Sequence, residues 1–171
     1  MTLAPSPSPK GYTARRLLIL AAVLFGAAAV ALNLGRTAGH APDWALLARQ
    51  PTVIHLHIFA AVAALLLGTV QLIGVKGAGL HRAIGWGWVV AMMVVAISSF
   101  FIRVIHPGSF SLIHLLSGWT LIALPMGIWA IRRGNVPRHA RAMTLTFIGG
   151  LIVAGAFTFL PGRLMWAIFF G

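Results

Sequence analysis

The sequence contains no cysteine, and Asp43 is the single carboxylate side chain among its 171 residues. The absence of cysteine excludes disulfides, thiolate metal sites and a cysteine nucleophile. The lack of further acids excludes paired-carboxylate hydrolysis, carboxylate cages for calcium or magnesium, and the Asp/Glu relays of many proton-coupled carriers. The chemistry left to the chain therefore rests on histidine, arginine and the backbone.

Charged residues of any kind are also scarce, at 8% of the chain against 60% hydrophobic residues. Apolar runs that approach the ~20 residues needed to cross ~30 Å of hydrocarbon recur along the whole length. The sequence therefore predicts an all-α integral membrane protein with no soluble domain. Its net charge of +12 comes from 13 Lys and Arg scattered between these runs. This pattern favours topology signals and contacts with anionic lipid over nucleic-acid binding.

We expect a disordered, Pro- and Ser-rich tail over 1–14 and a single transmembrane helical domain over 15–171. The domain should hold about five transmembrane helices, a peripheral N-terminal helix and a four-helix core, at about 17–34, 52–75, 83–105, 110–131 and 140–161. A short turn of helix capped by Asp43 should precede the core, and the apolar tail from Arg163 should lie along the membrane surface.

Lys and Arg are divided unevenly between the two sides of this topology, with nine on the side of the N-terminal tail and four on the other. The positive-inside rule then predicts a cytoplasmic N-terminus and an outer C-terminus in a bacterial inner membrane. The same topology places Trp44, Trp86, Trp88 and Trp129 in the aromatic belts at the membrane surfaces, so we expect no chemistry from them.

The histidines form the one constellation that suggests chemistry. His57 and His114 fall near the outer ends of the second and fourth helices, while His81 and His139 open the third and fifth helices on the inner side. At ~1.5 Å rise per residue the two tiers lie about 25 Å apart. Paired neutral imidazoles on facing helices suit the two axial positions of haem iron. Below His57 the same helix face continues with Ala61, Ala64, Gly68 and Gln71, mostly small residues that leave room for haem. Beside the inner tier, haem propionates would be neutralised by Arg82, Arg138 and Arg141.

Each of these features has a second interpretation. Small residues also let membrane helices pack closely, and histidines at helix ends also hydrogen-bond across a bundle. His55 competes with His57 as the inward residue, because aligning the two helical hairpins pairs His55 with His114. A third interpretation is an outer-face copper or zinc site that includes His55 and His106. The open functions are thus a haem-binding electron carrier or reductase subunit, a cofactor-free scaffold or small-molecule carrier, and an outer-face metal binder.

The sequence resembles a bacterial family of predicted membrane proteins, the domain of unknown function 2306, in the stretches 56–71, 80–85, 139–143, 150–158 and 160–163. This resemblance implies membership without a known activity, and it favours His57 over His55. The arrangement of the histidines also resembles cytochrome b561, which implies a four-helix core with one or two b-type haems. The outer haem would then be held by His57 and His114 and the inner one by His81 and His139. We expect such a carrier to exchange electrons with a quinone or a small reductant.

Overall fold

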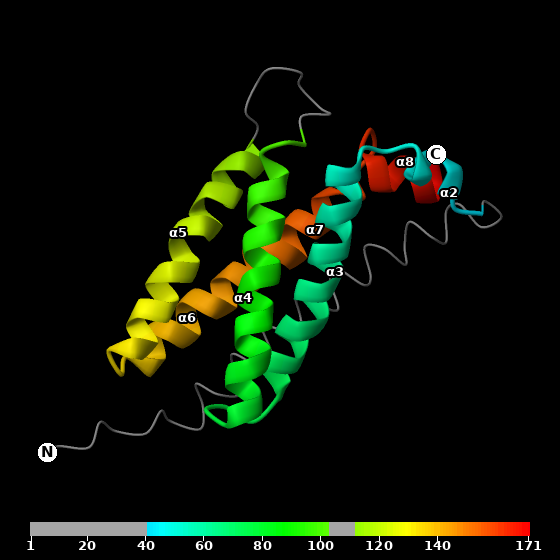
Figure 1. Ribbon diagram of the computed structural model, residues 1–171. Helices are drawn as coiled ribbons and strands as arrows, with labels where there is room; N and C mark the ends of the chain where they lie inside the picture. The colour runs from blue at the N-terminus through cyan, green and yellow to red at the C-terminus, as the bar shows by residue number, and fades with distance from the viewer. Residues whose placement is uncertain (1–40, 103–111) are drawn as a thin grey trace, which may run out of the picture.

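A computed structural model describes residues 41–102 and 112–171, and the regular elements in these ranges are helices (Figure 1). Within them four helical spans are long and apolar enough to cross a membrane: Thr52–Ile73, Gly79–Ser99, Ile113–Arg132 and Val136–Phe157. The predicted N-terminal helix over 17–34 and the N-terminal tail lie outside the described residues. For the core, the predicted all-α membrane architecture is confirmed.

Three of the spans are single helices, namely α3 (Thr52–Ile73), α4 (Gly79–Ser99) and α5 (Leu112–Arg132). The fourth span is composite, because α6 (Val136–Phe147) continues through the π-helical segment η1 (Ile148–Val153) into α7 (Ala154–Phe157). Gly149 and Gly150 lie in η1, where a Cβ on Gly150 would meet Met92 Cε of α4 at 3.1 Å. The wider π-helical turn thus coincides with a close approach to the neighbouring helix.

The helices pair as two hairpins. α3 packs along α4, α5 packs along α6, and α4 joins the hairpins by packing on α5. Figure 1 shows α3, α4 and α5 running beside one another while α6 and α7 cross behind them. α3 also contacts α6 and η1, which completes a four-helix core.

Two helices begin earlier than the sequence predicts. α4 begins at Gly79 rather than at 83, and α6 begins at Val136 rather than at 140. Asn135 caps α6 by accepting the Arg138 amide at 3.0 Å, and Pro137 is tolerated in a first turn because its missing N–H has no intrahelical role there. As a result, His81 and His139 each lie inside the first turn or so of a helix.

The centre of the bundle is tightly packed. Its buried apolar residues are Ala64, Trp88, Met92, Leu124, Phe147 and Leu151. A Cβ added to Gly68 would lie 2.5 Å from Phe147 Cδ2 and 2.6 Å from Trp88 Nε1, so no larger residue fits there. Trp88 is only 4% exposed, and its predicted place in an aromatic belt is therefore wrong. The indole enters the core because Gly68 leaves it the space. The expectation that this part of the α3 face leaves room for haem is therefore wrong, because Trp88 and Phe147 fill the space at Gly68.

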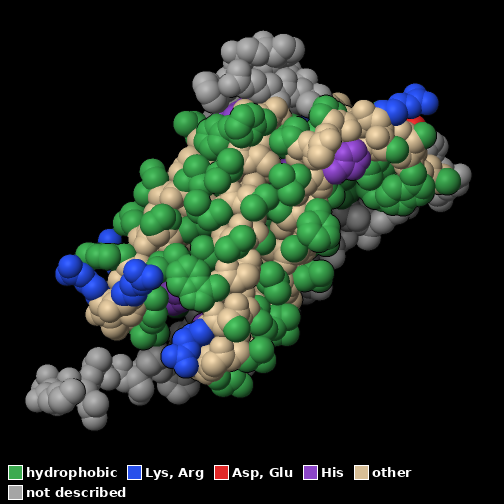
Figure 2. All heavy atoms as spheres, in the orientation of Figure 1, with side chains coloured by type: hydrophobic (Ala, Val, Ile, Leu, Met, Phe, Trp, Pro, Cys, Tyr) green, Lys and Arg blue, Asp and Glu red, His purple; other side chains and the backbone are tan. Residues whose placement is uncertain are grey.

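The long flank of the bundle is apolar. Figure 2 shows hydrophobic side chains over this surface, with Lys and Arg gathered at the ends. Phe59 is 75% exposed and Leu66 63% exposed, as expected of residues that face hydrocarbon instead of water. Six basic side chains lie at the end that holds the α3–α4 and α5–α6 turns, here called the basic end: Lys76, Arg82, Arg132, Arg133, Arg138 and Arg141.

Two short helices, α2 (Trp44–Ala48) and α8 (Leu164–Phe170), pack together at the opposite end. The Asp43 carboxylate accepts the Leu46 amide at 2.8 Å, so the predicted cap is present. The Asp43 amide donates to the Ile168 carbonyl at 2.8 Å, and the Trp44 ring meets the Phe169 ring edge-on. The side chain of Asp43 therefore caps α2, while its backbone amide and the Trp44 ring tie α2 to α8.

Candidate functional site

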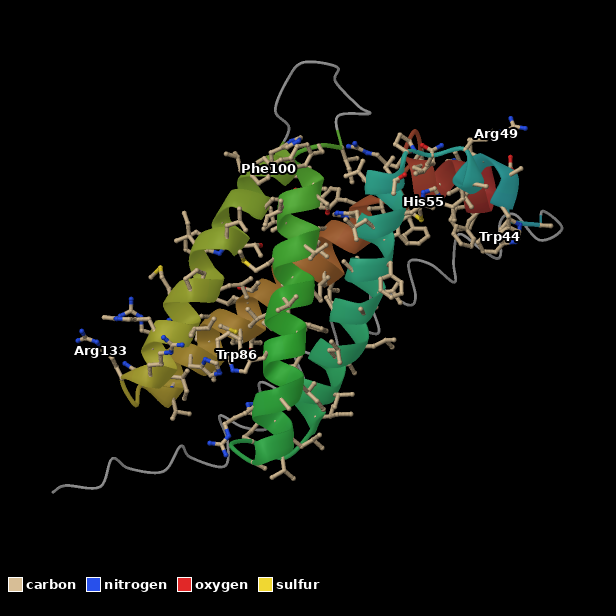
Figure 3. The ribbon with its side chains drawn as sticks, viewed as in Figure 1. Trp44, Arg49, His55, Trp86, Phe100 and Arg133 are labelled. Atoms are coloured by element: carbon tan, nitrogen blue, oxygen red, sulfur yellow. The ribbon has the colours of Figure 1, made fainter. Side chains whose placement is uncertain are left out.

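The two histidines of α3 lie on different faces. His55 is exposed, at the end of the bundle near Trp44 (Figure 3). His57 is half-buried, and its Nδ1 lies 2.8 Å from Ser98 Oγ of α4. The Ser98 hydroxyl also donates to the Val95 carbonyl at 3.1 Å. In the tautomer that matches this donation, His57 carries its proton on Nδ1 and its lone pair on Nε2.

The 3.6-residue period of α3 explains this division. The face that follows His57 turns inward, with Ala64 and Gly68 buried in the bundle. The face that follows His55 carries large exposed side chains, among them Phe59 and Leu66. Of the two candidates, the structure thus directs His57 toward the other helices.

A buried polar layer extends from His57 across α4 to α5. Ser99 Oγ lies 2.6 Å from Ser117 Oγ of α5 and 2.8 Å from the Ala96 carbonyl, and Ser117 Oγ lies 3.0 Å from the Ile113 carbonyl. His114 lies one turn before Ser117, is 5% exposed, and its ring centre is 5.8 Å from that of Phe100. We call this group the serine layer, and its members are His57, Ser98, Ser99, His114 and Ser117.

Ser98 and Ser99 were not among the site residues predicted from the sequence. The available signal was the pair of adjacent hydroxyls near the end of an otherwise apolar run, in the helix between the two candidate histidines. The structure shows both serines buried and hydrogen-bonded to neighbouring helices. His57 and His114 themselves approach α4 from opposite neighbours, the first at Ser98 and the second at Phe100.

At the basic end, His139 is also hydrogen-bonded through Nδ1 to a neighbouring helix. Its Nδ1 lies 2.9 Å from the Gly127 carbonyl of α5, and a carbonyl only accepts, so Nδ1 carries the proton. His81 of α4 is half-buried and within electrostatic range of His139 and Lys76. Gln71 Nε2 of α3 donates to the His81 carbonyl at 2.5 Å. The structure therefore brings His81 and His139 into one neighbourhood, here called the basic-end pair.

The arginines expected beside this pair are all exposed: Arg82, Arg138 and Arg141. The Arg138 guanidinium lies 5.9 Å from the centre of the Trp129 ring, over which Arg133 also stacks at 4.4 Å. Arg138 is thus partnered by an aromatic ring, and the predicted contact of the three arginines with haem propionates stays a prediction.

The described residues do not form a cluster of ligands for the outer-face metal site. Among the described residues, no group of three or more His, Asp or Glu is placed to hold a metal ion. His55 is exposed, and His106 lies outside the described residues. The copper or zinc alternative therefore rests on the sequence alone.

Three buried polar atoms have no hydrogen-bond partner in the described part of the chain: Gln71 Oε1, Trp88 Nε1 and Thr146 Oγ1. Gln71 adjoins the basic-end pair, whereas Trp88 belongs to the packed centre between that pair and the serine layer. Two histidine-bearing polar regions are thus separated by an apolar core that contains one unpartnered indole N–H.

A family model described as "Predicted membrane protein (DUF2306)" matches residues 54–170. The matched range begins in the first turn of α3 and ends in α8, so it contains both histidine regions and the core between them. Comparison with curated proteins and with solved structures gives no match.

Proposed function

The chain belongs to the DUF2306 family of predicted membrane proteins, and from this premise we propose that it is a small multi-pass electron carrier or reductase subunit that binds b-type haem. The observation that carries the proposal is that His57 and His139 each form a hydrogen bond through Nδ1 to a neighbouring helix. One of these side chains lies in the serine layer and the other in the basic-end pair, toward opposite ends of the bundle.

The donor chemistry of these residues fits haem iron. A metal-ligating imidazole coordinates through one nitrogen, while its other N–H donates a hydrogen bond that fixes the tautomer and the ring orientation. Ser98 serves His57 in this way, and the Gly127 carbonyl serves His139. Both Nε2 atoms keep their lone pairs for iron, with His114 and His81 as the partner ligands. Haem would supply a one-electron redox couple, and the protein residues hold and orient the imidazoles.

The packed centre supports electron transfer over movement of a solute. Between the two histidine regions, the space at Gly68 is filled by Phe147 and Trp88. A solute would need a path lined by polar groups, whereas an electron crosses a packed apolar core without one. The closed core is therefore consistent with a carrier of electrons and does not suit a small-molecule carrier.

A groove beside the serine layer supports a quinone as the electron partner. It has a volume of about 590 Å³, lies between α3 and α4, and is lined by Val53, Leu56, Val94, Ile97, Ser98 and Phe101. Its apolar walls suit a lipid-soluble ring, and the Ser98 hydroxyl is its one polar side chain. The same hydroxyl holds His57, so a quinone in this groove would lie close to the proposed ligand.

The distribution of charge supports an orientation. The basic end carries six of the eight Lys and Arg in the described ranges, while Arg49 and Arg163 lie at the other end. By the positive-inside rule the basic end faces the cytoplasm of a bacterial inner membrane, and the serine layer lies toward the outer face. Electrons would then cross between these faces.

The same two hydrogen bonds also favour a second candidate function, a cofactor-free membrane scaffold. In a scaffold, His57 and His139 would join α3 to α4 and α5 to α6, since each bond crosses a helix interface. The two functions predict different visible absorption of the protein and different effects of the histidine substitutions. A scaffold is colourless, and its histidine substitutions change assembly alone.

The test compares two substitutions of proposed ligands with a control substitution on α3. Full-length protein is purified from haem-supplemented cells, and haem per chain is measured for the wild type, His57→Ala, His139→Ala and the matched control His55→Ala. We expect each of the first two substitutions to remove one haem's signal and the control to keep the wild-type content. Equal haem content in all four proteins would refute the ligand assignments, and a wild type without haem would refute the function.

A further inference from the structure

A second groove opens on the lipid-facing surface between α4 and α5, toward the basic end. Its volume is about 370 Å³, and its lining includes Val89 and Met93 of α4 and Ile128 of α5. Leu124 forms a fully buried floor. Because the groove lies within two candidate membrane spans, the neighbour that meets it is hydrocarbon.

Two tryptophans and an arginine mark the end of this groove nearest the basic end. Trp86 and Trp129 line it and are 52% and 49% exposed, and Arg132 completes the lining. Figure 3 shows Trp86 on the half of the bundle that ends in the α5–α6 turn with Arg133. Tryptophan concentrates at the depth of lipid headgroups, so this end of the groove lies at the membrane interface.

Positive charge at this interface has no carboxylate to balance it. The guanidinium groups of Arg133 and Arg138 lie 4.4 and 5.9 Å from the centre of the Trp129 ring, and Arg132 precedes Arg133 in the chain. Asp43, the one carboxylate side chain, lies at the opposite end of the bundle, against α8. Guanidinium groups bind phosphate through paired hydrogen bonds, so the site is complementary to a phosphate held at headgroup depth.

We propose that this groove is a binding site for one anionic phospholipid, with an acyl chain along α4 and α5 and the phosphate at Arg132 and Arg133. The acyl chain packs on the apolar floor, and the two tryptophans flank the ester groups of the lipid. The arginines favour a headgroup with a net negative charge over a zwitterionic one. The proposal is independent of haem, because none of the histidines lines the groove.

The experiment uses full-length, delipidated protein in detergent and native mass spectrometry. Phosphatidylglycerol and phosphatidylcholine with identical acyl chains are added in turn, and a third arm adds inorganic phosphate with phosphatidylglycerol. We expect one phosphatidylglycerol to be retained with about tenfold preference over phosphatidylcholine, since each Arg near the surface contributes attraction to anionic lipid. Equal retention of the two lipids, or displacement of the lipid by free phosphate, would overturn the proposal.

Charge-matched variants locate the site. Arg132→Gln/Arg133→Gln should abolish the preference, whereas Arg49→Gln/Arg163→Gln removes the same charge at the other end and should leave it unchanged. Equal loss in both variants would show a general effect of charge and would contradict the proposed groove.

A second measurement does not depend on insertion of the Arg132→Gln/Arg133→Gln variant. It uses phosphatidylglycerol with brominated acyl chains, which quench tryptophan fluorescence. Brominated phosphatidylglycerol should quench wild-type tryptophan fluorescence more than it quenches Trp86→Phe/Trp129→Phe, and equal fractional quenching would overturn the site.

Discussion

The His57 Nδ1 atom of α3 lies 2.8 Å from the Ser98 hydroxyl of α4, and this contact joins a candidate ligand to the neighbouring helix. The Ser98 hydroxyl also donates to the Val95 carbonyl, and this donation matches the tautomer of His57 that is protonated on Nδ1. A serine that the sequence pattern did not single out thereby orients the His57 ring. In the proposed function Ser98 is a positioning residue, and it acts on haem through His57.

Ser98→Ala should weaken the α3–α4 interface and alter the haem held by His57. Interhelical hydrogen bonds in membranes contribute about 0.6 kcal/mol on average and up to about 1.7 kcal/mol, so we expect a stability loss in that range. Unfolding in mixed micelles measures this loss, with His55→Ala as an exposed control. In haem-loaded protein the midpoint potential of one haem should also shift, which a merely structural serine would not cause. An unchanged potential would remove the positioning role.

Gly68→Ala should destabilise the bundle, because the new Cβ would press on Phe147 and Trp88. Overpacking of this kind costs about 1–3 kcal/mol. Gly87→Ala is the matched control, since its Cβ would meet Leu67 Cδ1 at an ordinary 3.6 Å. The same unfolding measurement should show a loss for Gly68→Ala only. Similar stability of the two variants would mean that the core can make room for a methyl group at residue 68.

Trp88→Phe should leave stability nearly unchanged. The substitution removes an indole N–H that has no partner in the described part of the chain, and it also removes buried ring atoms. An unpartnered buried donor costs about 1–3 kcal/mol, so relief of that cost should offset most of the lost packing. Trp88→Ala, which leaves a cavity, should lose about 3–5 kcal/mol. A large loss in Trp88→Phe would indicate that the indole N–H has a bound partner in the folded protein.

Asp43→Ala should loosen α2 without unfolding the core. The carboxylate accepts the Leu46 amide, and loss of such a cap costs about 0.5–2 kcal/mol. Hydrogen exchange at the Leu46 amide should accelerate by about 2- to 30-fold, which is the same free energy expressed as a ratio. Asp43→Asn keeps an acceptor oxygen and should exchange nearly as the wild type does. Equal acceleration in both variants would assign the effect to the lost charge instead of the cap.

Much of the fold could be predicted because the bilayer demands long apolar helices. The core spans, the Asp43 cap and the inward face of α3 all follow from periodicity and local chemistry. The early starts of α4 and α6 were missed because Gly79 and Pro137 ordinarily signal turns, yet both are tolerated in the first turn of a helix.

The site was only partly predictable, because its decisive features lie between helices. The sequence identified the histidines, but it gave no indication of which neighbour holds each ring. Ser98 and the Gly127 carbonyl become partners only after α4 and α5 are packed. Trp88 was assigned to the membrane surface from its residue type, whereas the absent side chain of Gly68, on another helix, admits it to the core.

The reduced-minus-oxidised visible spectrum of the full-length wild-type protein shows whether the bundle binds redox-active haem. The protein is purified in detergent from haem-supplemented cells and is reduced with dithionite in the cuvette. The proposed function predicts a Soret band and a sharp α band that appears on reduction, as expected of low-spin haem between two imidazoles. A folded, colourless protein with no Soret band and no change on reduction would contradict it.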